Sequence, residues 1–183
     1  IQSVSFALER LGVAFQITDD PEEIWKADKI IFPGVGEAST TMSYLRERKL
    51  DQVIRDLKQP LLGVCLGMQL MCKYSEENNT ECLGIFEESV RMFVPTGDNK
   101  VPHMGWNNLS VNTTRSLCDG LQDANVYFVH SYAADVSGYT LAQTNHGNTF
   151  SAIVQKGNVM GAQFHPERSG TAGARLLKNF LSL

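Results

Sequence analysis

Apolar residues in the first half of the chain switch repeatedly between helical spacing and short, strand-like runs. Apolar residues three and four apart indicate one buried helix face, whereas a compact apolar run bounded by turn residues indicates a strand. Helical spacing predicts helices over 3–11, 22–27, 38–47, 50–57 and 67–73. Apolar runs predict strands over 13–17, 29–32 and 60–64. Strands separated by helices pair in parallel, and their carboxyl ends then meet at one edge of the sheet.

The second half consists mainly of short strand-like runs divided by turn residues. The runs predict strands over 89–94, 108–111, 126–130, 139–143, 151–155 and 159–164. Turn residues at 145–148 and 156–158 predict antiparallel hairpins, and helical spacing returns over 172–181. The two halves together predict one α/β domain over 1–183, with helices flanking a mixed, largely parallel sheet in three layers.

Composition and charge narrow the classes of function. The chain has 183 residues, 43% hydrophobic and 20% charged, as expected of an ordinary globular protein. A formal net charge of -4 without a long basic run argues against binding to nucleic acid or to an acidic membrane. No apolar stretch approaches the ~18 residues that a membrane-spanning helix needs, and the first residues do not resemble a signal peptide. We therefore expect a soluble, cytoplasmic protein.

The four cysteines are not spaced like metal ligands or like a disulfide framework. No C-x-x-C pair occurs, and no histidine stands at a zinc-ligand spacing, so no metal or other cofactor is expected. We interpret Cys72, Cys82 and Cys118 as small buried residues in a reducing compartment. Cys65 differs from them because of its neighbours.

Cys65 stands at the centre of the segment GVCLG, between a predicted strand and a predicted helix. This is a cysteine version of the G-x-S-x-G elbow, in which a sharp strand-to-helix turn exposes the nucleophile. The flanking Gly63 and Gly67 suit such a turn because a Cβ there would crowd it, and the helix N-terminus favours a thiolate. From these five residues alone, a buried cysteine at a tight turn without chemistry stays equally open.

A base for this cysteine follows the predicted strand 159–164. His165 ends that strand and Glu167 stands two residues on, so the carboxylate can orient the imidazole while the imidazole takes the thiol proton. His103 and His130 are competing bases that lack a carboxylate in this position. His146 falls in a predicted hairpin turn, where we expect it to be solvated.

The segments GVCLGMQ at 63–69 and QFHPE at 163–167 resemble the class I (triad) glutamine amidotransferases, which have a flavodoxin-like fold. The resemblance covers essentially the whole chain. It implies that Cys65 attacks the side-chain amide of glutamine to give a glutamyl thioester and ammonia. His165 would pass the protons and Glu167 would hold the imidazole.

The resemblance also implies how glutamine is held. The segment 33–36, which alone would be interpreted as an ordinary turn, resembles the oxyanion strand of the family. The main-chain N–H groups implied for the oxyanion are those of Val35, Gly36 and Leu66. The residues implied for binding glutamine are Gln69, Ser131 and Tyr132.

Met68, the segment PHMGWN at 102–107, HSY at 130–132 and ERSG at 167–170 resemble one branch of the family. Members of that branch form a heterodimer with a (β/α)8 cyclase subunit in histidine biosynthesis and pass ammonia to it. The resemblance implies that Arg168 lies at the mouth of the partner's channel and that the isolated chain hydrolyses glutamine weakly. The residues expected at the interface are Met104, Trp106, Tyr127 and Arg168. Without the resemblance, Trp106 would be expected in the core.

Three other functions stay open at this point. They are the glutaminase of a different synthase, a docking module without catalysis, and a cysteine hydrolase of γ-glutamyl peptides that needs no partner. The resemblance further implies a first β-strand before Ile1, which this sequence does not contain.

Overall fold

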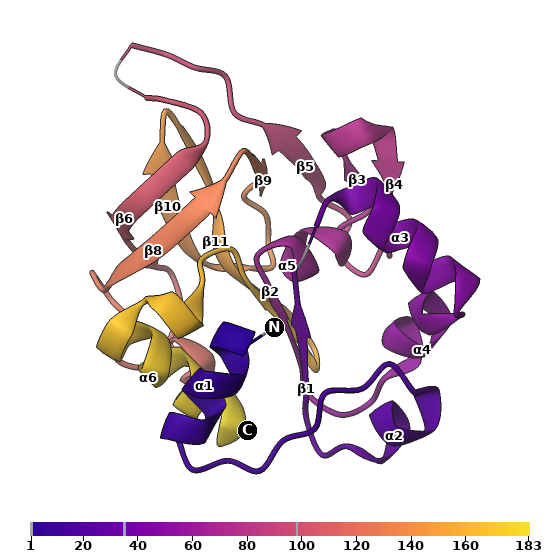
Figure 1. Ribbon diagram of the computed structural model, residues 1–183. Helices are drawn as coiled ribbons and strands as arrows, with labels where there is room; N and C mark the ends of the chain where they lie inside the picture. The colour runs from indigo at the N-terminus through magenta and orange to yellow at the C-terminus, as the bar shows by residue number, and fades with distance from the viewer. Residues whose placement is uncertain (1, 35, 98) are drawn as a thin grey trace.

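The computed structural model describes residues 2–34, 36–97 and 99–183 (Figure 1). The α-helices are α1 (Gln2–Arg10), α2 (Pro21–Lys26), α3 (Ala38–Glu47), α4 (Leu50–Asp56), α5 (Leu66–Leu70) and α6 (Gly170–Leu181). The 3-10 helices are η1 (Glu77–Asn79), η2 (Ser116–Cys118) and η3 (Pro166–Arg168). Each helix predicted from apolar spacing is therefore confirmed, with ends shifted by a few residues. Within the described residues no helix is long and apolar enough to cross a membrane.

A six-stranded mixed sheet runs through the middle of the molecule, in the order β1-β2-β12-β11-β10-β7. Its strands are β1 (Ile30–Pro33), β2 (Leu61–Val64), β7 (Ser110–Val111), β10 (Thr140–His146), β11 (Asn148–Lys156) and β12 (Val159–Ala162). The pairings β1 with β2 and β2 with β12 are parallel, and the others are antiparallel. The predicted mixed α/β fold and both predicted hairpins are confirmed. The parallel strands β1, β2 and β12 bring their carboxyl ends to one edge.

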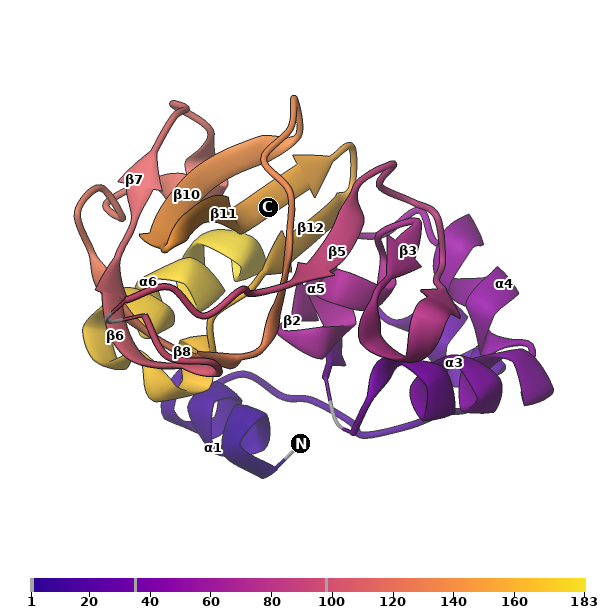
Figure 2. The same cartoon turned by 90° about the horizontal axis from the view of Figure 1, so that it is seen from above.

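Two smaller sheets complete the β structure. One has the order β4-β3-β5-β9, and the other pairs β6 with β8. Their strands are β3 (Tyr74–Ser75), β4 (Thr80–Glu81), β5 (Ser89–Met92), β6 (His103–Asn108), β8 (Asn125–His130) and β9 (Tyr132–Ala134). In Figures 1 and 2, β6 and β8 lie on the same side of the central sheet as α6.

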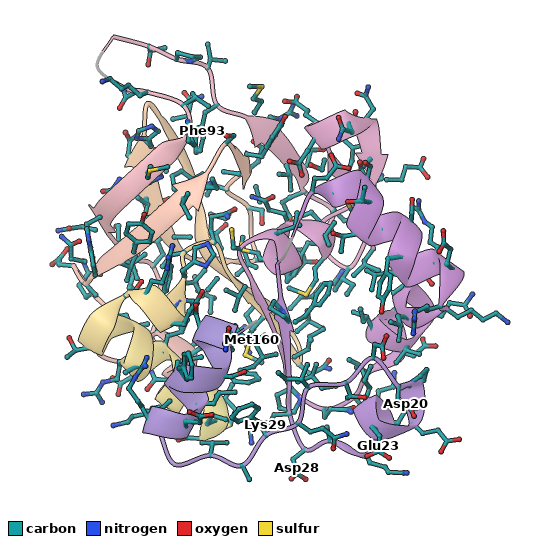
Figure 3. The ribbon with its side chains drawn as sticks, viewed as in Figure 1. Asp20, Glu23, Asp28, Lys29, Phe93 and Met160 are labelled. Carbon is teal, nitrogen blue, oxygen red and sulfur yellow. The ribbon has the colours of Figure 1, made fainter. Side chains whose placement is uncertain are left out.

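Helices cover the two faces of the central sheet, α1 and α6 on one and α3 and α4 on the other (Figure 2). The alternation of side chains along a strand explains the two cores. Leu62 of β2 packs with Met160 and Phe180 in the first core, whereas its neighbour Leu61 packs with Met42 in the second. Met160, labelled in Figure 3 near the centre of the molecule, pairs with Leu62 in register. Burial on both faces is what allows continuous apolar runs in these strands.

One predicted strand was wrong, and a strand of the structure was missed. Residues 13–17 form no strand, and Phe15 and Ile17 are 39% and 63% exposed. A compact apolar run gave the prediction, but a strand also needs a neighbouring strand for its main-chain hydrogen bonds, and the described residues provide none there. Conversely, β6 was not predicted. Its inward positions are polar or small while Met104 and Trp106 point outward, which inverts the usual pattern of a half-buried strand.

Replacing Gly67 with alanine tests the packing of α5 on β1. A Cβ at this position would collide with the main-chain oxygen of Phe32. We expect Gly67→Ala to lower the free energy of unfolding in urea by roughly 2–3 kcal/mol, as for an overpacked core site. Gly138→Ala is the matched control, because its Cβ would meet nothing within 4 Å and should change stability by less than about 0.5 kcal/mol. Equal stability of the two variants would contradict the packing argument.

Candidate active site

Cys65 occupies a strained turn between β2 and α5. Its backbone has φ 53° and ψ -112°, a region that a residue with a Cβ adopts at a cost of order 1–3 kcal/mol. The turn is closed by the N–H of Cys65, which donates to the carbonyl of Ala162 at 2.8 Å. An added Cβ on Gly63 would come within 2.8 Å of Gly67 C and Met68 N. The strand, turn and helix predicted from GVCLG are confirmed, including the need for glycine.

His165 stands beside Cys65 and is oriented by Glu167. The Nδ1 atom of His165 lies 2.8 Å from Oε1 of Glu167, and the two side chains are only 17% and 8% exposed. Because Nδ1 is occupied by the carboxylate, Nε2 is the ring nitrogen available to Cys65, whose proximity helps to raise the pKa of the imidazole. Among the described residues, Oε2 of Glu167 is a buried oxygen without a hydrogen-bond partner. The arrangement unites the three residues predicted as a catalytic triad.

The electrostatics of this group favour a positive imidazole. Burial lowers the pKa of His165, but the hydrogen bonds and negative charges of Cys65 and Glu167 outweigh burial and raise the pKa to about 9. A charged imidazole beside a sulfur favours the thiolate form of cysteine, which is the nucleophilic form. The site can therefore store a proton on His165 at neutral pH and release it to a leaving group.

The segment between β1 and α3 lies against the elbow. A Cβ on Gly34 would be 2.5 Å from the main-chain nitrogen of Leu66, so the main chain at Gly34 packs directly against the start of α5. Leu66 begins α5, and the first N–H groups of a helix have no acceptor within the helix. Gly36 has φ +84°, and beyond it the N–H of Ala38 donates to Glu77 at 2.7 Å. Val35, the remaining residue proposed for the oxyanion, lies outside the described residues.

Gln69 and Tyr132 come together one helical turn beyond Cys65. The Nε2 atom of Gln69 donates to the carbonyl of Tyr132 at 2.7 Å and to Oε1 of Gln163 at 3.0 Å. A main-chain carbonyl only accepts, so this pair of bonds decides which end of the Gln69 amide is nitrogen. Both N–H groups of Gln69 are used, and its Oε1 is the acceptor left for a ligand. Ser131 precedes this point, and its carbonyl accepts the N–H of Phe93 at 2.9 Å.

Gln163 is a residue of this site to which sequence reasoning assigned no role. Its side chain is fully buried, and Nε2 lies 3.8 Å from the sulfur of Cys65. It therefore connects Cys65 with Gln69. The signal was present in the sequence, since a glutamine at the end of an otherwise apolar strand needs a polar partner when it is buried.

The remaining histidines do not act on Cys65 but form their own cluster. His103 lies 3.0 Å from His130, between Nδ1 and Nε2. His146 stacks on His103 with ring centroids 4.1 Å apart and bonds through Nε2 to the carbonyl of Lys100 at 2.8 Å. His146 is thus half-buried, and the prediction that it is solvated was wrong because its hairpin folds back over β6.

Met104, Trp106 and Tyr127, proposed for a partner interface, lie on the outer face of β6 and β8, and Arg168 of η3 lies beside them. Met104 and Trp106 are 64% and 57% exposed, which excludes Trp106 from the core. The Trp106 and Tyr127 rings lie 5.9 Å apart edge to face, and the guanidinium of Arg168 lies 5.7 Å from the centroid of the Tyr127 ring. This face adjoins the triad, because the carbonyl of Tyr127 accepts the N–H of His165 at 3.0 Å.

The other thiols are buried and protonated. Burial raises the pKa of Cys72, raises that of Cys82 to about 11 and raises that of Cys118 to about 12. All four cysteines are free, and Cys65 alone among them is partly exposed. In the parts of the chain that the structure describes, no group of three His, Cys, Asp or Glu side chains is placed to hold a metal ion.

A family model for class-I glutamine amidotransferases matches residues 2–183. The chain belongs to this family. It is 53% identical over 184 residues to imidazole glycerol phosphate synthase subunit HisH of Bacteroides fragilis, covering all of this chain and 94% of that protein. It is 50% identical over 190 residues to the protein of that name from Vibrio cholerae, covering all of this chain and 93% of the relative.

Solved structures share the fold at low sequence identity. A structure described as a glutamine amidotransferase has a TM-score of 0.76 and 23% identity. The match covers 99% of this chain and 92% of the chain in that structure. A glutamine amidotransferase from Thermotoga maritima has a TM-score of 0.64 and 16% identity, covering 98% of this chain and 76% of its own. Both support the class-I glutamine amidotransferase fold expected from the sequence.

Substituting Glu167 with glutamine tests the electrostatics of the triad. NMR titration should show a pKa of about 9 for His165, and Glu167→Gln should lower it because the carboxylate charge is lost. This folded-state pKa exceeds the ordinary 6.5, so the charged imidazole stabilises the fold fully below pH 6.5 and loses that effect as the pH rises through about 9. Glu87→Gln, at an exposed glutamate, is the control. An unchanged His165 pKa in Glu167→Gln would contradict the assignment.

Proposed function

We propose that this chain is the glutaminase subunit of an imidazole glycerol phosphate synthase, acting in histidine biosynthesis. The proposal rests on one observation above all: Cys65 stands in a strained, glycine-flanked turn with a charged His165 and a buried Glu167 beside it. Identity of about half over the full chain to HisH subunits supports the same function.

The first half of the reaction forms a thioester. Cys65 Sγ attacks the side-chain carbonyl carbon of glutamine, and the proton that the thiol gave up resides on His165 Nε2. His165 then donates this proton to the amide nitrogen as the carbon–nitrogen bond breaks. Ammonia leaves, and the glutamyl group stays on the sulfur.

The second half releases glutamate. His165 takes a proton from water, the hydroxide adds to the thioester carbon, and the carbon–sulfur bond breaks with return of the proton to sulfur. Glu167 keeps Nδ1 of the imidazole occupied throughout, so Nε2 always faces the reacting atoms.

Main-chain N–H groups stabilise the negative oxygen that forms in both halves. The N–H of Leu66, at the start of α5, is the first donor. Val35 and Gly36, which follow Gly34 between β1 and α3, supply the second donor. Orientation of that segment is a natural control point, because one peptide unit decides whether the donor faces the substrate.

Gln69, Ser131 and Tyr132 hold the amino-acid end of glutamine. Gln69 Oε1 is an acceptor that fits an ammonium group, since both Gln69 N–H groups are already used by Tyr132 and Gln163. A ligand held here places its side chain toward Cys65, one turn of α5 away.

The partner in this proposal is a (β/α)8 cyclase subunit that forms a heterodimer with the chain and takes up the ammonia. Met104, Trp106, Tyr127 and Arg168 form the docking face, with Arg168 at the mouth of the partner's channel. Arg168 directly follows Glu167, so this face is adjacent to the point where ammonia is released. The four free thiols fit a reducing cytoplasm as the location.

Replacing Cys65 with alanine should lower glutamine hydrolysis at least about 10³-fold, as expected when the nucleophile of a triad is removed. Ammonia release is measured with and without the cyclase subunit, and Cys82→Ala, at a buried thiol, is the control. Residual activity close to that of the unaltered chain would exclude Cys65 as nucleophile. Equal rates for the isolated chain and the complex would contradict coupling to a partner and favour a partner-independent hydrolase.

Replacing Trp106 with alanine should weaken binding of the cyclase subunit about 30-fold, as for a central interface tryptophan worth roughly 2 kcal/mol. Calorimetry of the purified subunits measures the dissociation constant. Trp25→Ala is matched to it, because Trp25 on α2 is 45% exposed but lies far from β6. A larger loss for Trp25→Ala than for Trp106→Ala would place the interface elsewhere.

A further inference from the structure

A buried chain of polar side chains leads from strand β6 to the carbonyl of Tyr132. His130 Nδ1 lies 2.7 Å from that carbonyl oxygen. On its other side, His130 Nε2 lies 3.0 Å from Nδ1 of His103. Nε2 of His103 then lies 3.4 Å from Nδ2 of Asn107, which also donates to the carbonyl of Asn145 at 2.9 Å. The triad mechanism uses none of these side chains.

The chain of hydrogen bonds has only one possible direction. The Tyr132 carbonyl can only accept, so His130 Nδ1 carries a proton. In a neutral ring Nε2 is then an acceptor, and His103 must donate to it from Nδ1. Nε2 of His103 accepts in turn, and Asn107 supplies the donor. Each ring is therefore held in one tautomer by the bond that its other nitrogen makes.

The surroundings keep both rings uncharged. His130 and His103 are 6% and 4% exposed, and Phe93, Phe128 and Phe150 pack around them. Burial lowers the pKa of His130 to about 3 and that of His103 to about 4. Figure 3 labels Phe93 beside β6 and β8, at the end of the molecule opposite Asp28.

The far end of this series of hydrogen-bonded side chains lies in the proposed glutamine site. The Tyr132 carbonyl has two lone pairs, and the two donors that fill them are His130 Nδ1 and Gln69 Nε2. The position of this carbonyl therefore sets the orientation of the Gln69 amide. If His130 did not hold the carbonyl, the β8–β9 connection could turn and Gln69 would lose the partner that aims its Oε1 at the ligand.

We propose that His130 and His103 are positioning residues for glutamine binding: as a fixed pair of tautomers they hold the Tyr132 carbonyl, and through it Gln69, in the orientation that receives the substrate ammonium. The inference rests on the proposed function, since it assigns a role toward glutamine. It predicts an effect on the KM for glutamine and on no step of the chemistry at Cys65.

Two substitutions of His130 separate positioning from packing. His130→Phe keeps the ring among the phenylalanines but removes both hydrogen bonds. His130→Asn leaves a gap but places an amide N–H close to the position of Nδ1. If His130 positions the carbonyl, His130→Phe raises the KM for glutamine about tenfold, the scale of one hydrogen bond. His130→Asn then has a KM close to that of the unaltered chain. If His130 only fills space, the order is reversed and the inference fails.

Kinetics are measured on the full chain assembled with the cyclase subunit, and kcat should change less than twofold in both variants. His146→Phe is the matched control, because it retains the stack on His103 and touches neither Tyr132 nor Gln69. A KM rise in His146→Phe equal to that in His130→Phe would overturn the inference. Should His130→Phe not fold, His103→Phe replaces it, since it removes the donor that fixes the His130 tautomer; a rise of about threefold supports the inference and an unchanged KM overturns it.

Labelling of Cys65 distinguishes this inference from the proposed function. A diazoketone analogue of glutamine must bind at the site to alkylate Cys65, whereas iodoacetamide only needs the thiolate. His130→Phe should slow alkylation by the diazoketone about tenfold and leave alkylation by iodoacetamide unchanged. Equal slowing of both reagents would overturn the positioning role alone. Failure of the diazoketone to label the unaltered chain would overturn the proposed function and this inference with it.

Discussion

The strained turn at Cys65 is the constraint on which the rest of the site depends. A cysteine held at φ 53° persists only because β2 on one side and α5 on the other leave it no alternative. Gly63 and Gly67 permit that packing, since a Cβ on Gly63 would collide with α5 and a Cβ on Gly67 would collide with the main chain of Phe32. The N–H of Cys65 is tied to β12 through Ala162. Because β12 leads directly to His165, the same strand pairing that holds Cys65 also positions the proposed base.

The charge distribution around the turn matches this geometry. A buried carboxylate with one unpartnered oxygen is costly unless a positive charge lies beside it, and the imidazolium of His165 supplies that charge. The thiols elsewhere in the chain are buried without such a neighbour and have raised pKa values. Cys65 therefore differs from the other three cysteines in its neighbours and in its exposure.

The polar interior of β6 and β8 gives these two strands opposite properties on their two faces. Inward, His103 and His130 connect to the carbonyl that holds Gln69. Outward, Met104 and Trp106 are exposed beside Tyr127, whose main chain bonds to His165. A subunit that docks on the outer face therefore contacts two strands that are hydrogen-bonded to the proposed site. One connection runs through His130 and Tyr132 to Gln69, and the other runs from Tyr127 to His165.

The sequence by itself determined the elements whose signals are local. Helical spacing predicted the helices, the GVCLG segment predicted the turn at Cys65, and the pair His165 and Glu167 predicted the orienting contact, because each of these depends on residues close together in the chain. The tertiary structure alone decided the rest. Residues 13–17 had the apolar run of a strand but no neighbouring strand to pair with, and β6 was not recognised because its inward residues are polar or small. The contacts of Gln163 with Cys65 and Gln69, and of His130 with Tyr132 and His103, required the fold, since buried polar groups find partners that no local pattern specifies.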